Sequence, residues 1–355
     1  MFSEESLAMV PQYTAKLPLL GAAIRRQAAE YSAEEGRPFD FNQAFWTPPL
    51  TPRQAYRLEE KQIERRLQLS PLVSLTDHDD TRAAALLRVI NQFRSAPVSI
   101  EWTIPFGLTF FHLGVHNLPA EHAEELQSKM ASYTSGGACR QLTDCLETLN
   151  SYPQVLIVLN HPLWDEKGIG SALHRGTLSR LLETHRRRIH AVEVNGLRPW
   201  VENKAVLSLG RELDWPVISG GDRHGREPNA VLNVSTADSF SEFVEEVRYG
   251  RKSHVIFMQQ YRDPLRLRIL QTIVDVVRDY PENVEGRRSW SDRVFFRDPQ
   301  GSTTALTHIW KDGGPKIVRQ LICAMRLLEW RGAQSALRIA LDDRSGKWSE
   351  REASV

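Results

Sequence analysis

Cysteine is scarce in this chain, and its scarcity argues against two kinds of protein. The 355 residues include three cysteines, Cys139, Cys145 and Cys323, and no two of them form a Cys-x-x-Cys pair. An odd and sparse set is not typical of a disulfide framework or of a thiolate zinc site. We therefore expect the three thiols to be reduced.

An excess of charge and a long apolar run are also lacking. The 45 basic and 44 acidic residues nearly cancel, which gives no support for a nucleic-acid or membrane-surface partner. No run approaches the roughly 18 apolar residues of a membrane span. Glu4 and Glu5 stand where a signal peptide carries basic residues. A cytoplasmic protein without a membrane partner is the expectation.

Two common catalytic motifs are missing as well. The chain has no Gly-x-Ser-x-Gly elbow for a nucleophilic serine and no Gly-x-x-x-x-Gly-Lys-Ser/Thr loop for nucleotide phosphates. The chemistry must therefore be sought among histidines and carboxylates.

Histidines and carboxylates follow five apolar segments that the pattern predicts as strands. These are Leu72–Leu75 before Thr76-Asp77-His78-Asp79-Asp80, Val98–Ile100 before Glu101, Leu108–Phe111 before His112, Val155–Leu159 before Asn160-His161, and Val217–Ser219 before Gly220-Gly221-Asp222-Arg223-His224. Continuous apolar runs that alternate with helices are typical of parallel strands, and the strand ends of an α/β barrel meet at one rim. The sequence therefore predicts an α/β barrel with metal-capable groups at its C-terminal rim.

The order of predicted elements divides the chain into three parts. Residues 1–37 form a lead-in, residues 38–257 form the barrel, and residues 258–355 form a helical C-terminal extension. The first barrel strand is expected at Pro38–Asn42. Thr51 and Pro52 predict the start of a helix, and Pro105-Phe106-Gly107 predicts a turn that brings Glu101 and His112 onto neighbouring strands.

Imidazoles and carboxylates without thiolates suit zinc, manganese or iron better than calcium or magnesium. The six candidate metal ligands are His78, Glu101, His112, His161, Asp222 and His224. They suffice for one or two divalent ions, with Glu101 or Asp222 able to bridge a pair roughly 3.5–4 Å apart. Such a site creates a hydroxide nucleophile, so the reaction class is hydrolysis.

Each candidate also has a structural interpretation. A single histidine at a strand end often only donates hydrogen bonds, and Asp77, Asp79 and Asp80 could cap the following helix. Asp222-Arg223-His224 could be a surface turn. The basic residues near the rim could hold a phosphate or be solvated loop cations; they are Lys167, Arg198, Arg223 and Arg226. The recurrence at five successive strand ends favours a shared site.

At these motifs the chain resembles the polymerase and histidinol phosphatase (PHP) superfamily over residues 38–257. Thr76-Asp77-His78-Asp79 is similar to that family's Thr-Asp-His-Asp motif, and Asn160-His161-Pro162 resembles its His-Pro motif. Further similar segments are Glu101, His112, Ala191–Asn195, Asp222-Arg223-His224 and Gly250–His254. The resemblance implies a metal-dependent phosphoesterase on a distorted (β/α)7 TIM-like barrel, with Glu193 and Asn195 shaping the pocket.

The chain departs from the family at the first motif, His-x-His. Its counterpart is Asp40-Phe41-Asn42-Gln43-Ala44, in which Asn42 and Ala44 replace both histidines. This departure leaves the ion count open.

Two functions are compatible with these residues. The first is a hydrolase of a small phosphorylated substrate or nucleotide, with Asp77, His161 and Asp222 in catalysis. The second is a degenerate binding or scaffolding module with an incomplete metal site. An amidohydrolase is less favoured, because it too begins with His-x-His and the carbamylated lysine of that class has no candidate here.

Overall fold

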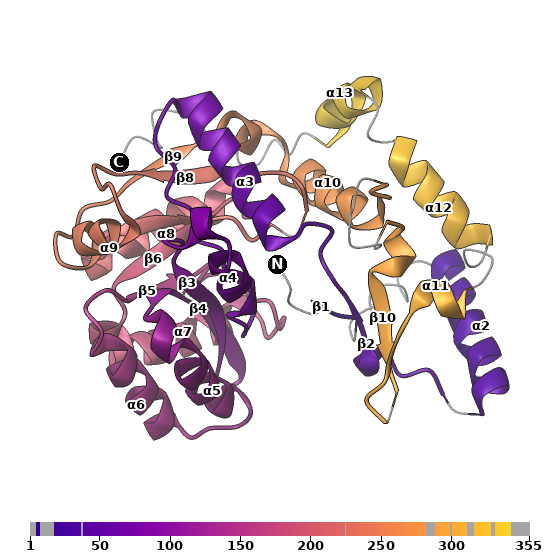
Figure 1. Cartoon of the computed structure of the whole chain (residues 1–355), viewed down its shortest axis with the longest axis horizontal. Coiled ribbons are helices and arrows are strands. Elements are labelled where there is room, and N and C mark those ends of the chain that lie inside the picture. The colour runs from indigo at the N-terminus through magenta and orange to yellow at the C-terminus, as the bar shows by residue number, and fades with distance from the viewer. Residues whose placement is uncertain are drawn as a thin grey trace. The chain divides into compact units, whose positions relative to one another are not determined.

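The computed structural model describes residues 5–7, 18–36, 38–223, 225–281, 288–298, 300–310, 316–327 and 331–341. These residues form two compact units. The described part of the first unit covers residues 50–223 and 225–268, whereas that of the second lies before residue 50 and after residue 268. Figure 1 labels most elements of both units.

The first unit is built on a five-stranded mixed sheet. Its strands follow one another in chain order: β3 (Val98–Phe106), β4 (Thr109–Leu118), β5 (Leu156–Asn160), β6 (Ala191–Asn195) and β7 (Val217–Gly220). The pairs β3–β4 and β4–β5 are antiparallel, and the pairs β5–β6 and β6–β7 are parallel. Gly107 has a φ of 61°, which glycine adopts without strain, and it forms the turn between β3 and β4. The expected neighbouring position of the Glu101 and His112 strands is confirmed.

Helices and a second, two-stranded sheet complete the first unit. The antiparallel pair consists of β8 (Val231–Val234) and β9 (His254–Phe257). The helices are α3 (Pro52–Gln62), α4 (Arg82–Arg88), α5 (Ala123–Thr134), α6 (Cys139–Asn150), α7 (Ser171–His185), α8 (Trp200–Leu213) and α9 (Phe240–Arg248). At the start of α3, Gln54 N–H donates to the Thr51 hydroxyl and Thr51 N–H donates to Gln54 Oε1. This capping box satisfies two N–H groups of the first turn, so α3 begins where Thr51 and Pro52 predicted.

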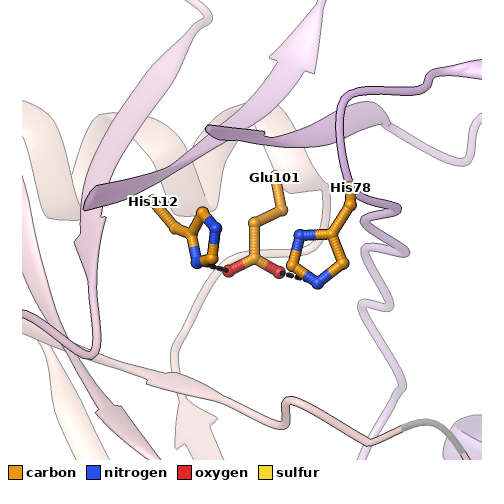
Figure 2. A group of neighbouring side chains, drawn as sticks. All are labelled: His78, Glu101 and His112. Carbon is orange, nitrogen blue, oxygen red and sulfur yellow. Dashed lines mark ion pairs between the residues drawn. The ribbon is translucent and has the colours of Figure 1, made fainter. Parts of the chain in front are cut away.

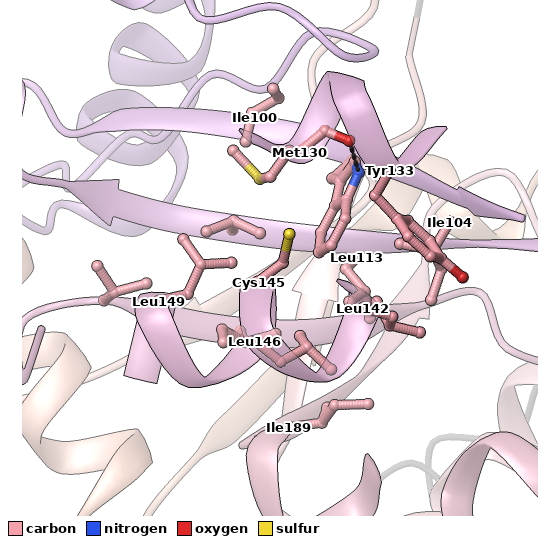
Figure 3. Close-up of a cluster of buried hydrophobic side chains, with 14 of the residues drawn as sticks. Ile100, Ile104, Leu113, Met130, Tyr133, Leu142, Cys145, Leu146, Leu149 and Ile189 are labelled. Atoms are coloured by element: carbon pink, nitrogen blue, oxygen red, sulfur yellow. Dashed lines mark hydrogen bonds between the residues drawn. The ribbon is translucent and has the colours of Figure 1, made fainter. Parts of the chain in front are cut away.

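One face of the large sheet is apolar, because alternate residues of a strand point to opposite sides. Ile100, Trp102 and Leu113 are fully buried there, in a cluster shared with α5 and α6 (Figure 3). Trp102 Nε1 donates to the Met130 carbonyl over 3.1 Å and ties β3 to α5. Each large apolar side chain contributes about 1.5–3 kcal/mol on full burial, so this face anchors the sheet.

Helix α9 covers the apolar part of the other face. Val244 and Val247 of α9 share a buried cluster with Leu156, Val158 and Ala191 of β5 and β6. The helix begins at a Ser239 cap, whose hydroxyl accepts a hydrogen bond from Glu242 N–H. The same face becomes polar further along β5 and β6, and this polar end carries the candidate site.

The α/β class is confirmed, but the described strands do not close into the expected TIM-like barrel. They pair as an open sheet of five strands and a separate sheet of two, and two of the four junctions in the large sheet are antiparallel, contrary to the expected parallel order. A barrel buries its inner face against itself, whereas α9 buries the corresponding face here. An open sheet with both faces covered needs no closure.

Two predicted strands were wrong. Leu72–Leu75 forms no strand, and the segment after it makes only isolated bridges at Asp77 and His78. Pro38–Asn42 is not extended throughout, because the Asp40 carboxylate accepts hydrogen bonds from Asn42 N–H (2.9 Å) and Asn42 Nδ2 (2.7 Å). This local turn starts a 3-10 helix at Phe41–Gln43.

The second unit holds a four-stranded antiparallel sheet. Its order is β1 (Glu5–Ser6), β2 (Ala44–Trp46), β10 (Val294–Arg297) and β11 (Thr303–Ala305). Its helices are α2 (Pro18–Glu35), α11 (Leu306–Ile309), α12 (Lys316–Leu327) and α13 (Arg331–Ala340), and α10 (Leu265–Val277) begins in the first unit. The Phe45 and Phe295 rings stack at 5.3 Å, as do those of Phe39 and Phe296 at 4.8 Å. The C-terminal part therefore contains strands as well as helices.

Two further expectations concern the chain as a whole. The division at residues 37/38 and 257/258 stays a prediction. Within the described residues, no helix combines the length and the apolar character needed to cross a membrane.

His190 makes the stability of the first unit depend on pH. Its Nδ1 accepts a hydrogen bond from Ile157 N–H (2.9 Å), and its Nε2 lies 2.8 Å from Asn150 Oδ1. Burial, followed by the charge of Arg248, lowers the pKa of His190 to about 3. Between pH 7 and pH 5 the unfolded chain gains a proton at this histidine that the folded chain does not, which costs about 2 kcal/mol of stability.

We expect His190→Asn, whose amide oxygen can still accept from Ile157 N–H, to lose about 2 kcal/mol less than wild type between pH 7 and pH 5. Urea unfolding at the two pH values measures the difference. His254→Asn, which changes an exposed histidine, serves as the control and should follow wild type. An equal loss in H190N and wild type would contradict the assignment.

Candidate metal centre

Three neighbouring strands place polar residues at one level of the sheet. His112 of β4 pairs with Thr103 of β3 and with Asn160 of β5, and Glu101 pairs with Gly114. This register puts Glu101, His112 and Asn160 on the same face. A Cβ at Gly114 would lie 2.8 Å from Asn160 Oδ1, so only glycine leaves room for this amide. Glu101 and His112 therefore lie inside β3 and β4 and not at strand ends as predicted, because both strands continue beyond these residues.

His78 approaches Glu101 from the segment before α4. Asp79 N–H donates to the Glu101 carbonyl (2.9 Å), and Glu101 N–H donates to the Asp77 carbonyl (2.9 Å). The Asp79 carboxylate accepts from Thr103 N–H over 2.7 Å, and burial raises the pKa of this carboxyl. The Thr-Asp-His-Asp segment is thus fixed to β3 by its backbone and by Asp79, which leaves the His78 ring beside Glu101.

The three side chains His78, Glu101 and His112 form a compact group. Their ligand-type atoms all lie within 4.8 Å of one another (Figure 2). His78 Nε2 is 4.0 Å from Glu101 Oε2, and His112 Nδ1 is 3.7 Å from Glu101 Oε1. Glu101 and His112 are buried, whereas His78 is partly exposed. One carboxylate thus has an imidazole on each of its oxygens.

A third imidazole, that of His161, contacts the same carboxylate. His161 Nε2 lies 3.2 Å from Glu101 Oε1 and 3.3 Å from His112 Nδ1. Asn160 Nδ2 donates to Glu101 Oε1 over 3.0 Å. His161 has a φ of 26°, and its N–H donates to Glu193 Oε2 over 2.9 Å. This hydrogen bond holds the unusual backbone turn that directs the His161 ring toward Glu101.

The group is electrostatically coupled. Burial raises the pKa of Glu101, but the hydrogen bond with His161 and the charges of the three histidines outweigh it and hold the pKa well below its usual value. Burial lowers the pKa of His112 to about 4. Burial also lowers that of His161, yet its hydrogen bond and charge interaction with Glu101 prevail and raise the pKa to about 9. Glu101 is therefore ionised, His112 neutral and His161 protonated at neutral pH.

This donor set fits a divalent metal ion. An ionised carboxylate and a neutral imidazole are the ligand forms that a metal requires, and imidazole with carboxylate suits zinc, manganese or iron. Glu101, His112 and His78 could hold the ion together, and His161 could join them on losing its proton. Asn160 fixes the orientation of the Glu101 carboxylate, as residues outside the coordination sphere commonly do.

The other predicted site residues are placed differently. Asp77 is buried beside the group, and its carbonyl accepts from Glu101 N–H. Asp222 does not belong to the compact group formed by the described residues, and its Oδ2 lies 2.9 Å from Arg198 Nη2. His224 lies outside the described residues. The metal and catalytic roles assigned to these three residues stay predictions.

Three residues contribute more than the sequence suggested. Asn160 binds Glu101, and its position directly before His161 on an apolar strand was an available signal. Glu193, whose pKa burial raises to about 7, supports His161, and a Cβ at Gly220 would overlap its carboxylate. Arg198, one of the predicted loop cations, is 9% exposed and ion-paired. No local pattern distinguishes it from an ordinary loop arginine.

Comparison with known proteins gives little further guidance. No family model matches the chain, and no curated protein matches it. Among solved structures, one from Bifidobacterium adolescentis, provisionally named a metal-dependent phosphoesterase, is 14% identical. The match covers 56% of this chain and 91% of that one, with a TM-score of 0.35. A likeness at this level does not decide the family.

The charge state of His161 can be tested in the metal-free protein. We expect its ring to titrate near pH 9 and that of His112 near pH 4, as followed by NMR of the histidine rings. Glu101→Gln removes the largest favourable charge interaction of the His161 proton, so the pKa of His161 should fall from about 9. A His161 pKa near 6.5 in both proteins would contradict the described coupling.

Proposed function

We propose that the chain is a metal-dependent hydrolase that cleaves a phosphate ester. The observation that carries the proposal is the buried Glu101 carboxylate with His78, His112 and His161 around it. Three histidines converging from separate segments on one carboxylate are more than a structural ion pair needs. A divalent ion held here would supply an activated water and a charge that stabilises the phosphoryl oxygens.

The residues around the ion would donate the proton to the leaving group and orient the groups of the site. His161 carries a proton beside Glu101 and is proposed as the acid that protonates the leaving group. Glu193 and Asn160 orient His161 and Glu101. Asp77 and Asp222 are proposed as further catalytic carboxylates, because the first is buried beside Glu101 and the charge of the second acts on His161.

Membership of the PHP superfamily is the finer form of this proposal. Its support is the order of the Thr76–Asp79, Glu101, His112 and Asn160-His161-Pro162 segments, whose histidines and glutamate meet in one site. The open sheet and the missing His-x-His motif are departures from the family's distorted (β/α)7 barrel. The segment 40–44, taken as the counterpart of that motif, lies in the second unit.

The substrate is proposed to be a small phosphorylated molecule or nucleotide, acted on in the cytoplasm. The balanced charge of the chain does not favour a nucleic acid. A chain that binds the ion but cleaves no ester would instead be the binding module that the missing first motif suggested.

Hydrolysis should depend on the metal and on Glu101. We expect the manganese-loaded protein to release phosphate from p-nitrophenyl phosphate or a nucleoside monophosphate, and a chelator to abolish the reaction. Glu101→Gln and His112→Asn should each lower the rate by more than about 100-fold, since changes outside a coordination sphere already cost 10–100-fold.

The matched control is Glu125→Gln, which changes an exposed carboxylate on α5 that also lies near a histidine, His122. It should retain the wild-type rate. If zinc, manganese and iron in turn give no hydrolysis of any of these esters, the proposed activity is wrong.

A further inference from the structure

Arg198 lies between two carboxylates beside the candidate metal centre. Its Nη2 is 2.9 Å from Asp222 Oδ2, and its Nε is 3.8 Å from Glu202 Oε1. Arg198 is 9% exposed, so protein groups and not water surround most of its side chain. A cation between two carboxylates is the arrangement in which a metal ion is commonly held.

The guanidinium is fixed in this position. Its central carbon lies 4.1 Å from the centroid of the Trp164 ring, and its Nη1 donates to the Leu197 carbonyl over 3.2 Å. The Arg198 carbonyl accepts a hydrogen bond from the Tyr261 hydroxyl at 3.1 Å. Stacking and backbone contacts therefore hold the charge in one place, as planar arginine side chains allow.

Asp222 follows the end of β7 beside the centre. It comes two residues after Gly220, where an added Cβ would overlap the Glu193 carboxylate that accepts from His161 N–H. Nevertheless, the compact group that the described residues form contains His78, Glu101 and His112 without Asp222. The Asp222 carboxylate is bound by Arg198 instead.

We propose that Arg198 keeps Asp222 out of metal coordination and supplies the charge that a second ion provides in two-metal phosphoesterase sites. The inference rests on the proposed function and specifies its site: one ion at His78, Glu101 and His112, and a guanidinium as the second electrophile. Arg198 Nε is buried, faces Glu202 and has no hydrogen-bond partner among the described residues, so the guanidinium would act through its charge and not by direct contact with the substrate.

The composition of the first-motif counterpart agrees with a single ion. Asn42 and Ala44 stand where the two histidines of that motif are expected, and the Asn42 amide binds Asp40. A second ion would therefore lack two imidazole ligands and would have to rely on carboxylates such as Asp222 and Glu202.

Counting ions per chain tests the inference on the full-length protein. Elemental analysis after equilibration with manganese, with calorimetric titration for affinity, should give one ion in wild type. Asp222→Asn should also bind one ion, with an affinity within about threefold of wild type, because Asp222 is not a ligand. Arg198→Gln should bind two, because Asp222 and Glu202 lose the cation between them.

The control is Asp214→Asn, which breaks an exposed Asp–Arg pair with Arg251 and should leave one ion bound. Thermal unfolding of each variant checks that it folds. If one of D222N and R198Q does not fold, the ion count of the other decides the question. Two ions in wild type, a tenfold loss of affinity in D222N, or one ion in R198Q would overturn the role of Arg198. Binding of no ion by wild type would instead overturn the metal centre itself, and the inference with it.

Discussion

The buried negative charge of Glu101 is the constraint on which the candidate site depends. A carboxylate taken out of water costs several kcal/mol unless positive charge and hydrogen bonds replace the solvent. Here the His161 imidazolium and the Asn160 amide bind one oxygen, and the His78 ring approaches the other. Because Glu101 is ionised and His112 is neutral, the folded chain holds both side chains in the form that a divalent ion would require.

The sheet makes this burial possible because it places apolar side chains on one face and the polar side chains of the site on the other. Trp102 and Leu113, the neighbours of Glu101 and His112 in sequence, point into the apolar cluster under α5 and α6. The register of β3 with β4 then brings Glu101 and His112 together on the other face. Where that face is apolar, α9 covers it, and where it is polar it forms the site. A shift of one residue in this register would exchange the two faces and destroy both.

The sequence predicted the centre of the site better than the fold around it. His78, Glu101, His112 and His161 each stand in or directly after a short apolar segment, and this local pattern was sufficient to group them. Closure of a barrel is a long-range property, because it requires the two edge strands of the sheet to pair with each other. Here a segment such as α9 covers the face that a barrel would enclose, and no local sequence pattern predicts this.

The errors have similar physical causes. The strand expected at Pro38–Asn42 was wrong because the Asp40 carboxylate accepts a hydrogen bond from Asn42 N–H and turns the chain, which the apolar pattern does not show. The ion pair between Asp222 and Arg198 was not predicted, because it is a contact made only in the folded chain. The strand expected at Leu72–Leu75 was wrong: this segment pairs with no other strand, and only Asp77 and His78 after it make isolated bridges.

If Glu101 and its histidines form a metal centre, anomalous diffraction from crystals grown with manganese should locate the ion there. We expect one strong peak about 2.0–2.2 Å from a Glu101 oxygen and from the ring nitrogens of His78 and His112. No peak at Glu101, or a peak coordinated by Asp222 in place of these histidines, would contradict it.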